Sequence, residues 1–163
     1  MSEDIVVRCA ASSDYDAVIA ILTEVDALHR VELPWLFRAS VEQPRPRDWF
    51  EKWLHDDRSG ILVAALAGNV VGVVTVLLRT APDFPVFIPQ RWGVVDNLVV
   101  AHSARRRGVG TRLMRAAEAW AAERRAPWIE LGVYEFNQVA RDFYATLGYA
   151  PTWTKLRKVA SEP

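Results

Sequence analysis

The hydrophobic positions of the chain follow two periods, one typical of helices and one of strands. Near the start, residues 5–8 form a short apolar run that predicts a strand. After it, apolar residues recur at the spacing of one helical face and stop before Pro34: Val18, Ile21, Leu22, Val25 and Leu28. The aromatic and leucine positions of residues 49–54 predict a second helix, and Gly60 is predicted to end this helical region.

The middle of the chain predicts a run of strands. Residues 61–66 and 70–78 are rich in valine and are joined by Ala67-Gly68-Asn69, which is the pattern of a β-hairpin. After a proline-containing loop, residues 94–100 (VVDNLVV) form a third apolar run. We therefore expect three strands in succession before the chain reaches a glycine-rich segment.

The last third of the chain alternates helices with strands. Apolar residues at i, i+4, i+8, i+11 and i+12 predict a helix after the glycine-rich segment: Val109, Leu113, Ala117, Trp120 and Ala121. Residues 128–133 predict a strand, Asn137 begins another helix that Gly148 stops, and residues 149–159 predict a strand that completes the sheet. The order β-α-α-β-β-β-α-β-α-β predicts an α+β fold in one domain, residues 1–163.

Composition and charge narrow the classes of function. Lys and Arg number 20, as do Asp and Glu, so a globally basic nucleic-acid-binding protein is not expected, and the loop arginines are not interleaved with aromatic residues. The single cysteine excludes an internal disulfide, and the three histidines show no metal-ligand spacing, so we expect no metal. The acidic start lacks an apolar signal region and no run is long enough for a membrane span, so we expect a cytoplasmic protein.

The segment from Arg105 to Thr111 (RRRGVGT) carries the strongest chemical signal. Two glycines one residue apart, where a strand gives way to a helix, let backbone N–H groups close around an anion that the helix dipole favours. The segment lacks the lysine and hydroxyl residue of a nucleoside triphosphate loop and the third glycine of a dinucleotide loop. It therefore predicts a local phosphate site of another kind.

Two motifs together carry a family resemblance. They are Arg105-x-x-Gly108-x-Gly110, placed after Leu98-Val99-Val100, and Asn137-x-x-Ala140-x-x-Phe143-Tyr144-x-x-Leu147-Gly148-Tyr149. In combination they resemble the acetyl-CoA-binding core of the GNAT superfamily of N-acetyltransferases. The resemblance implies a three-layer fold, with a mixed and mostly antiparallel central sheet and helices on both faces. It also implies that the strand before the glycine loop splays from the next strand, so that the pantetheine arm of the coenzyme fits between them.

The resemblance further implies a role for each motif residue. The strand backbone at Leu98, Val99 and Val100 would bond to the pantetheine arm, and Asn137 would also contact that arm. The pyrophosphate would be held by the glycine loop, with charge added by Arg105 or Arg106 and N–H groups supplied by Arg107, Gly108, Val109, Gly110 and Thr111. Tyr144 would protonate the leaving thiolate; from the residues alone, a tyrosine beside Phe143 fits a buried helix position.

The base that takes the proton of the amine is predicted from the strand itself. Asp96 lies two residues before Leu98, so a period of two would place both side chains on the same face, and a carboxylate there could accept a proton through water. Glu130 on the next strand is a second candidate. Either carboxylate could instead pair with an arginine as a structural contact.

We therefore expect acetyl transfer from acetyl-CoA, the acyl-donor substrate, to a primary amine by direct attack in a ternary complex. The alternative is a catalytically silent domain of the same fold that binds acyl-CoA as a sensor or scaffold. The acceptor is expected to contact residues 28–50 and 80–92, whose aromatic and acidic residues suit a polyamine, an amino acid or a peptide N-terminus. No nucleic-acid or membrane partner is expected, and a homodimer is compatible with the sequence.

Overall fold

The structure, a computed structural model, describes residues 4–38, 42 and 44–160. The chain divides into two compact units, Met1–Gly132 and Val133–Pro163. Each unit is described by itself below. The prediction of a single domain over residues 1–163 stays a prediction.

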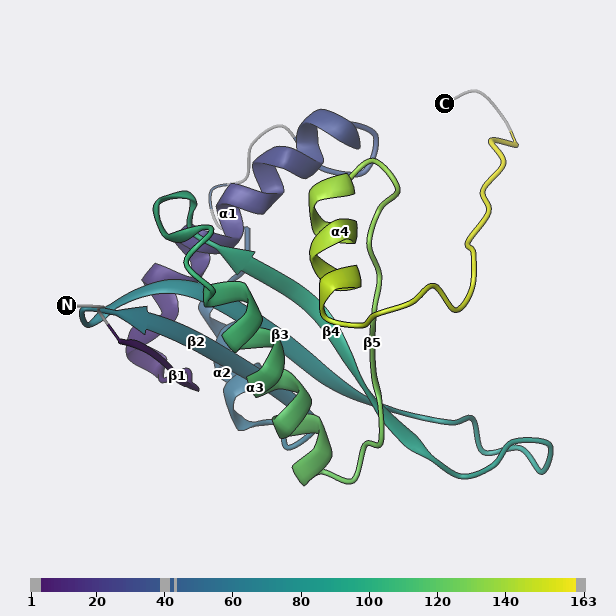
Figure 1. Cartoon of the computed structure of the whole chain (residues 1–163). Coiled ribbons are helices and arrows are strands. Elements are labelled where there is room, and N and C mark those ends of the chain that lie inside the picture. Colours follow the sequence, from purple (N-terminus) through teal and green to yellow (C-terminus); the bar gives the residue numbers. More distant parts are fainter. Residues whose placement is uncertain (1–3, 39–41, 43, 161–163) are drawn as a thin grey trace. The chain divides into compact units, whose positions relative to one another are not determined.

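The first unit contains a five-stranded sheet in the order β1-β2-β3-β4-β5 (Figure 1). Its strands are β1 (Ile5–Cys9), β2 (Ser59–Leu66), β3 (Asn69–Thr80), β4 (Arg91–Val100) and β5 (Ile129–Leu131). The first four strands pair in antiparallel fashion, and β5 runs parallel to β4. The predicted mixed and mostly antiparallel sheet is confirmed.

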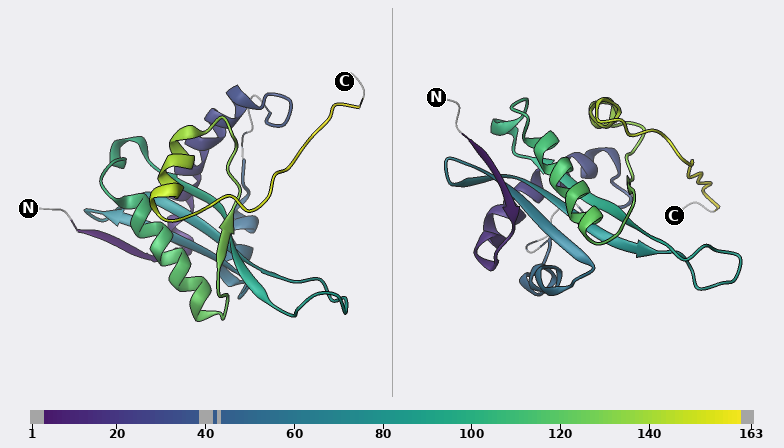
Figure 2. Two further views of the ribbon diagram at one scale, coloured as in Figure 1. Left: turned by 45° about the vertical axis from the view of Figure 1, so that its right-hand side comes forward. Right: turned by 60° about the horizontal axis from the view of Figure 1, so that its bottom comes forward.

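Helices cover both faces of this sheet (Figure 2). A 3₁₀ turn (Ser12–Asp14) leads into α1 (Tyr15–Glu32), and α1 and α2 (Arg47–His55) lie on one face, whereas α3 (Val109–Glu123) lies on the other. The core under α1 and α2 comprises Val18, Ile21, Leu22, Phe50, Ile61, Val63, Val73 and Val99. Every apolar position predicted to form the buried stripe of α3 is buried: Val109, Leu113, Ala117, Trp120 and Ala121.

Gly60 has a different role from the predicted one, because it lies inside β2 and does not end a helix. A Cβ atom at this position would come within 2.8 Å of the Trp120 ring, so the glycine allows the indole of α3 to lie directly against the sheet. The helical region ends earlier, at His55. The hydroxyl of Ser59, the first residue of β2, donates to the carbonyl oxygen of Trp53 at 2.9 Å and fastens the strand to that helix.

The two hairpins of the sheet differ in length. β2 and β3 are joined by Ala67 and Gly68, whose φ angles of 49° and 81° are those of the tight turn that matches strand twist, so the predicted hairpin is confirmed. β3 and β4 are joined by residues 81–90, which are closed at the base by a bond of 2.9 Å from the Ala81 N–H to the Gln90 carbonyl oxygen. In both views of Figure 2 this longer connection projects away from the sheet of the first unit.

The second unit contains α4 (Gln138–Thr146), which is followed by Gly148 at a φ of 88°. Residues 149–159, predicted as the last strand, form neither helix nor strand, so that prediction is wrong. The apolar residues Trp153, Leu156 and Val159 are three apart, and a strand would turn neighbours in that series to opposite faces. Pro151 also lacks the N–H group that a ladder requires.

Within the described ranges, no helix is both long and apolar enough to cross a membrane. Among the same residues, no three or more His, Cys, Asp or Glu side chains are grouped so that they could hold a metal ion.

A bidentate ion pair joins β1 to the start of α1. The guanidinium of Arg8 donates to both carboxylate oxygens of Asp14, at 2.6 and 2.9 Å, and the Ala11 N–H donates to the same carboxylate at 2.8 Å. Because the Arg8 hydrogen bonds favour the charged form, the pKa of the Asp14 carboxyl is lowered from its ordinary value. Asp14 is buried, so its charge depends on these partners.

Replacing Asp14 by Asn is expected to lower the free energy of unfolding by about 1–3 kcal/mol at neutral pH, since a buried charged hydrogen bond is lost. The folded-state pKa lies below the unfolded one, so this stabilisation is present above about pH 4 and disappears as the pH falls through the folded pKa. Urea denaturation at pH 7 and pH 3 measures the effect. An equal difference between variant and wild type at both pH values would contradict the ion-pair account.

Candidate active site

β4 is paired on both edges only over its first half. β5 pairs with Gly93 to Val95 and ends at Leu131, whereas β3 remains paired with β4 as far as Val100. From Asp96 onward, no strand of the described residues covers the β5 edge of β4. This is the predicted splay between the strands before and after α3.

The unpaired edge presents peptide groups to a ligand. The Ala101 N–H donates to the Val71 carbonyl oxygen at 2.9 Å, so the alternation of the strand turns the peptide groups of Val100 and Leu98 away from β3. Arg105 agrees with this direction, because its Nε donates to the Val100 carbonyl oxygen at 3.1 Å. Val99 differs, since the same alternation turns its peptide groups towards β3. An amide-bearing arm could add to this edge as a strand would.

A β-bulge lies where the splay begins. Thr75 pairs with Asn97 and Val76 with Val95, so Asp96 is the extra residue of β4. Gly93 and Val99 are six residues apart, yet a Cβ on Gly93 would face Ala121 of α3 while Val99 packs under α1 and α2. The alternation of side chains therefore reverses between them. The predicted shared face of Asp96 and Leu98 assumed an unbroken period of two, and because the bulge lies at Asp96 itself, that shared face stays a prediction.

The bulge places Asp96 where β4 and β5 separate, and the residue is exposed to solvent. The Asn97 side chain holds this position, because its Nδ2 donates to Oδ2 of Asp96 at 2.9 Å and to the hydroxyl of Thr75 at 3.0 Å. Thr75 is fully buried. A buried hydroxyl thus orients the amide that contacts Asp96, which leaves the other carboxylate oxygen available for water or an amine.

The glycine loop ends in a helix N-terminus with available amides. Gly108 is the N-cap of α3 at a φ of 81°, and the first intrahelical bond runs from the Arg112 N–H to the Gly108 carbonyl oxygen at 3.1 Å. The N–H groups of Val109, Gly110 and Thr111 precede that bond and have no acceptor within the helix. A Cβ on Gly108 would meet nothing within 4 Å, so the space beside the loop is open. This donor set suits a diphosphate.

The three arginines of the loop differ in their surroundings. Arg105 is held by the Val100 carbonyl oxygen and by Glu24 of α1, whose Oε2 lies 3.6 Å from its Nη2. The same Glu24 oxygen accepts from the N–H of His102 at 3.1 Å. Arg105 therefore fastens the loop to β4 and α1. Arg106, which is exposed and at a φ of 60°, is better placed to supply charge to an anion, and Arg107 is also exposed.

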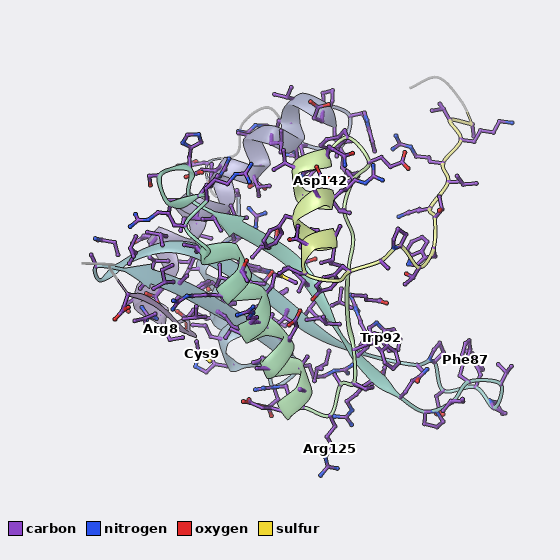
Figure 3. The ribbon with its side chains drawn as sticks, in the orientation of Figure 1. Arg8, Cys9, Phe87, Trp92, Arg125 and Asp142 are labelled. Atoms are coloured by element: carbon purple, nitrogen blue, oxygen red, sulfur yellow. The ribbon has the colours of Figure 1, made fainter. Side chains whose placement is uncertain are left out.

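Glu130 has a structural contact that sequence reasoning missed. Its Oε1 accepts from the indole Nε1 of Trp92 at 2.8 Å, and the Trp92 ring stacks on Trp128 with centroids 5.8 Å apart. Figure 3 shows Trp92 on the lower part of β4, towards the long hairpin. The contact ties β5 to β4 below the splay, which makes Glu130 a weaker candidate for the base than Asp96.

The second unit holds the other two motif residues. Asn137 is the N-cap of α4, and its Oδ1 accepts from the Ala140 N–H at 3.1 Å, so this residue has a structural role besides the predicted contact with the coenzyme. Tyr144 lies on α4 between the rings of Phe143 and Tyr149, with centroids 5.3 and 5.9 Å away. Burial raises the pKa of the Tyr144 phenol to about 12. The phenol is therefore protonated throughout the physiological range.

Residues 28–50 and 80–92 are the two segments predicted to contact the acceptor, and contacts within the first unit hold part of the first segment in place. Arg45 donates to both oxygens of the buried Asp26 on α1, at 2.5 and 3.0 Å, and its carbonyl oxygen accepts from the Tyr15 hydroxyl at 2.8 Å. Residues 39–41 and 43 of this segment lie outside the described residues. The segment 80–92 is the long hairpin and the start of β4.

Known proteins resemble this chain in sequence and in fold. Residues 24–149 match the model of the acetyltransferase (GNAT) family. The chain is 31% identical to the L-amino acid N-acetyltransferase AaaT of Escherichia coli K12, over 91% of this chain and 84% of that protein. It is 33% identical to an uncharacterized N-acetyltransferase of Archaeoglobus fulgidus over 61% of this chain, and the match spans 66% of that relative. A mutant BH1408 protein from Bacillus halodurans has the same fold, with a TM-score of 0.89, 24% identity and coverage of 96% and 99%.

Proposed function

Because the chain belongs to the acetyltransferase (GNAT) family, we propose that it is an enzyme that transfers an acetyl group from acetyl-CoA to a primary amine. The observation that carries the proposal is the unpaired edge of β4, which leads along the chain into the open N-terminus of α3. An amide-bearing arm and a diphosphate are the two parts of coenzyme A that such neighbouring sites would bind. Acetyl-CoA supplies the acyl group as a thioester, and side chains of the protein handle the protons.

We assign the binding of coenzyme A mainly to backbone groups of the protein. Leu98 and Val100 would bond to the arm through their peptide groups, and the amides of Val109, Gly110 and Thr111 would bond to the diphosphate. Arg106 and Arg107 would add positive charge, while Arg105 keeps the loop in place through Glu24. Asn137 stays a proposed contact of the arm through its Nδ2, since its Oδ1 caps α4.

Asp96 is the proposed acceptor of the proton that the amine must lose. It lies where β4 and β5 separate, which is where a thioester carried by the arm would be reached, and its carboxylate is exposed. A carboxylate there both attracts an ammonium ion and passes its proton to water. Asn97 and Thr75 hold the carboxylate in position.

Tyr144 is the proposed partner of the leaving thiolate, with a role that its pKa defines. A phenol whose pKa burial raises to about 12 is a weaker acid than a thiol, so complete proton transfer to the thiolate is unfavourable. A hydrogen bond from the neutral phenol has no such cost and stabilises the negative charge as it develops. We therefore assign Tyr144 as a hydrogen-bond donor to the sulfur.

The acceptor class we propose is a small molecule with an α-amino group. It is supported by the similarity to the E. coli protein, whose name gives L-amino acids as its substrates. Charge and aromatic character in the segments 28–50 and 80–92 suit such a ligand. Peptide N-termini and polyamines are the competing acceptors.

A thiol-release assay with acetyl-CoA and a panel of amines tests the function. We expect release of coenzyme A that depends on the amine, together with an acetylated product identified by mass spectrometry, and L-amino acids should be turned over faster than polyamines or peptides. Binding of acetyl-CoA without turnover of any amine in the panel would contradict the proposal and would support a silent acyl-CoA-binding domain.

Replacing Asp96 by Asn is expected to reduce kcat/KM most at low pH. The substitution keeps the size of the side chain and removes the charge, so the variant depends on the small fraction of amine that is already neutral, and that fraction grows as the pH rises. Turnover is measured between about pH 6 and pH 9. The control is Asp57→Asn, which removes an exposed carboxylate from the turn between α2 and β2, outside the segments proposed to contact the acceptor. Equal profiles for Asp96→Asn and wild type would leave water or Glu130 as the acceptor of the proton.

A further inference from the structure

The hairpin between β3 and β4 ends in an exposed apolar tip, residues 81–90 (APDFPVFIPQ). Phe84, Val86, Phe87 and Ile88 are exposed by 65%, 83%, 47% and 74%. Figure 3 shows Phe87 on this tip, beyond the part of the hairpin covered by helices of the first unit. Four large apolar side chains gathered on one projection indicate a contact surface rather than ordinary surface variation.

The tip is stiff, which favours binding. Pro82, Pro85 and Pro89 fix their own φ angles, and the Phe87 N–H donates to the Phe84 carbonyl oxygen at 2.9 Å. The bond from the Ala81 N–H to the Gln90 carbonyl oxygen closes the base at 2.9 Å. Little conformational entropy would therefore be lost when the tip meets a partner.

The same unit carries a hollow of matching character at the end of α1. It is lined by Ala27, Arg30, Val31, Pro34 and Phe37. The apolar face of α1 continues here to Leu28, and both Leu28 and Val31 are exposed. The hollow is apolar apart from the guanidinium of Arg30. The tip is apolar apart from the carboxylate of Asp83, which precedes Phe84, and the amide of Gln90 at its base.

We propose that two copies of this chain form a dimer in which the tip of each copy lies in the α1 hollow of the other. Phe84 and Phe87 would fill the hollow against Val31, Pro34 and Phe37, and Asp83 would pair with Arg30 across the interface. Tip and hollow then complement each other in apolar character and in charge. This inference concerns assembly and does not depend on the proposed reaction.

The size of the surfaces favours a reciprocal contact. If each of the four tip side chains buries roughly 100 Å² and the hollow an equal area, one contact buries about 800 Å² in total, which is the size of a crystal-packing contact. Two contacts related by a twofold axis bury about 1,600 Å², the size of a standard stable interface. A membrane is the other surface that could cover an apolar tip. The net charge of zero and the acidic residue on the tip disfavour an anionic bilayer.

The oligomeric state of the full chain in sedimentation velocity tests the proposal. We expect wild type to be dimeric at about 10 µM, Phe84→Ser/Phe87→Ser to be monomeric, and the control Val139→Ser, which changes an exposed valine of α4, to remain dimeric. A monomeric wild type up to about 100 µM, or a dimer that survives the double substitution, would overturn the proposal. A monomer that floats with phosphatidylserine vesicles would overturn it in favour of the membrane.

Exchanging the charges of Asp83 and Arg30 tests whether the α1 hollow is the surface that receives the tip. Asp83→Arg and Arg30→Asp should each raise the dimer dissociation constant at least tenfold, because each places like charges opposite one another. The double variant restores the pair and should recover most of the affinity. Circular dichroism confirms that each variant is folded. A double variant no better than the weaker single variant would overturn the assignment of the α1 hollow as the receiving surface.

Discussion

Replacing Gly108 by Val is expected to abolish the binding of acetyl-CoA. Gly108 has a φ of 81°, a conformation that a β-branched residue adopts only with strain of about 1–3 kcal/mol, so the loop would have to rearrange. The rearrangement moves the amides of Val109, Gly110 and Thr111, and the new side chain would occupy the open space where the diphosphate is proposed to lie. Binding that depends on several amides together should not survive this change.

Thermal unfolding with and without acetyl-CoA measures this effect. Saturating ligand at 100 times its dissociation constant stabilises wild type by about 2.7 kcal/mol, and this gain should vanish in Gly108→Val. Gly68→Val is the matched control. Gly68 also has a φ of 81° and nothing within 4 Å of its Cβ position, but it lies in the β2–β3 turn. The control should lose stability and keep the gain from acetyl-CoA. An undiminished gain in Gly108→Val would contradict the loop assignment.

Replacing Tyr144 by Phe is expected to lower kcat by roughly 10²-fold or more, with little change in the affinity for acetyl-CoA. One hydrogen bond to the developing thiolate is lost, and comparable donors in other enzymes contribute a factor of this size. Because burial raises the pKa of Tyr144 to about 12, the phenol stays neutral at lower pH. The ratio of wild-type to variant kcat should therefore be constant between about pH 7 and pH 10.

Tyr149→Phe is the control for this measurement, since it removes a hydroxyl from the neighbouring ring, 5.9 Å away between centroids. It should retain nearly full turnover. Two results would count against the role of Tyr144. One is an unchanged kcat in Tyr144→Phe. The other is a ratio that falls as the pH rises towards 10, which would show that the group involved titrates in that range.

Local signals in the sequence predicted those parts of the fold that depend on nearby residues. The stripe from Val109 to Ala121 predicted a helix with one buried face, because its period reflects packing against a single surface. Turns were predicted at Gly68 and Gly108 because glycine adopts a positive φ without strain, and both residues have a positive φ in the structure. The splay of β4 was implied by the family resemblance and is present in the strand pairing. The roles of Asp96, Tyr144 and Asn137 stay predictions.

The contacts that the sequence did not predict join residues that are far apart in the chain. Glu24 contacts His102 and Arg105, but no spacing in the sequence connects α1 with the glycine loop. Glu130 was considered as a base because of its strand, and its bond to Trp92 depends on the register of β4 with β5. The predicted last strand relied on apolar content in residues 149–159, although the spacing of three did not fit a strand face.

The bulge at Asp96 has a consequence for the length of the chain at this point. Deleting Asp96 would leave Val95 paired with Val76 and Asn97 paired with Thr75, and each side of the strand would keep its present face, because the alternation reverses at the extra residue. Deleting a residue elsewhere in β4 would instead exchange the inward and outward sides of part of the strand. The strand should therefore tolerate the loss of one residue only at Asp96, where the loss would straighten β4 and remove an exposed carboxylate.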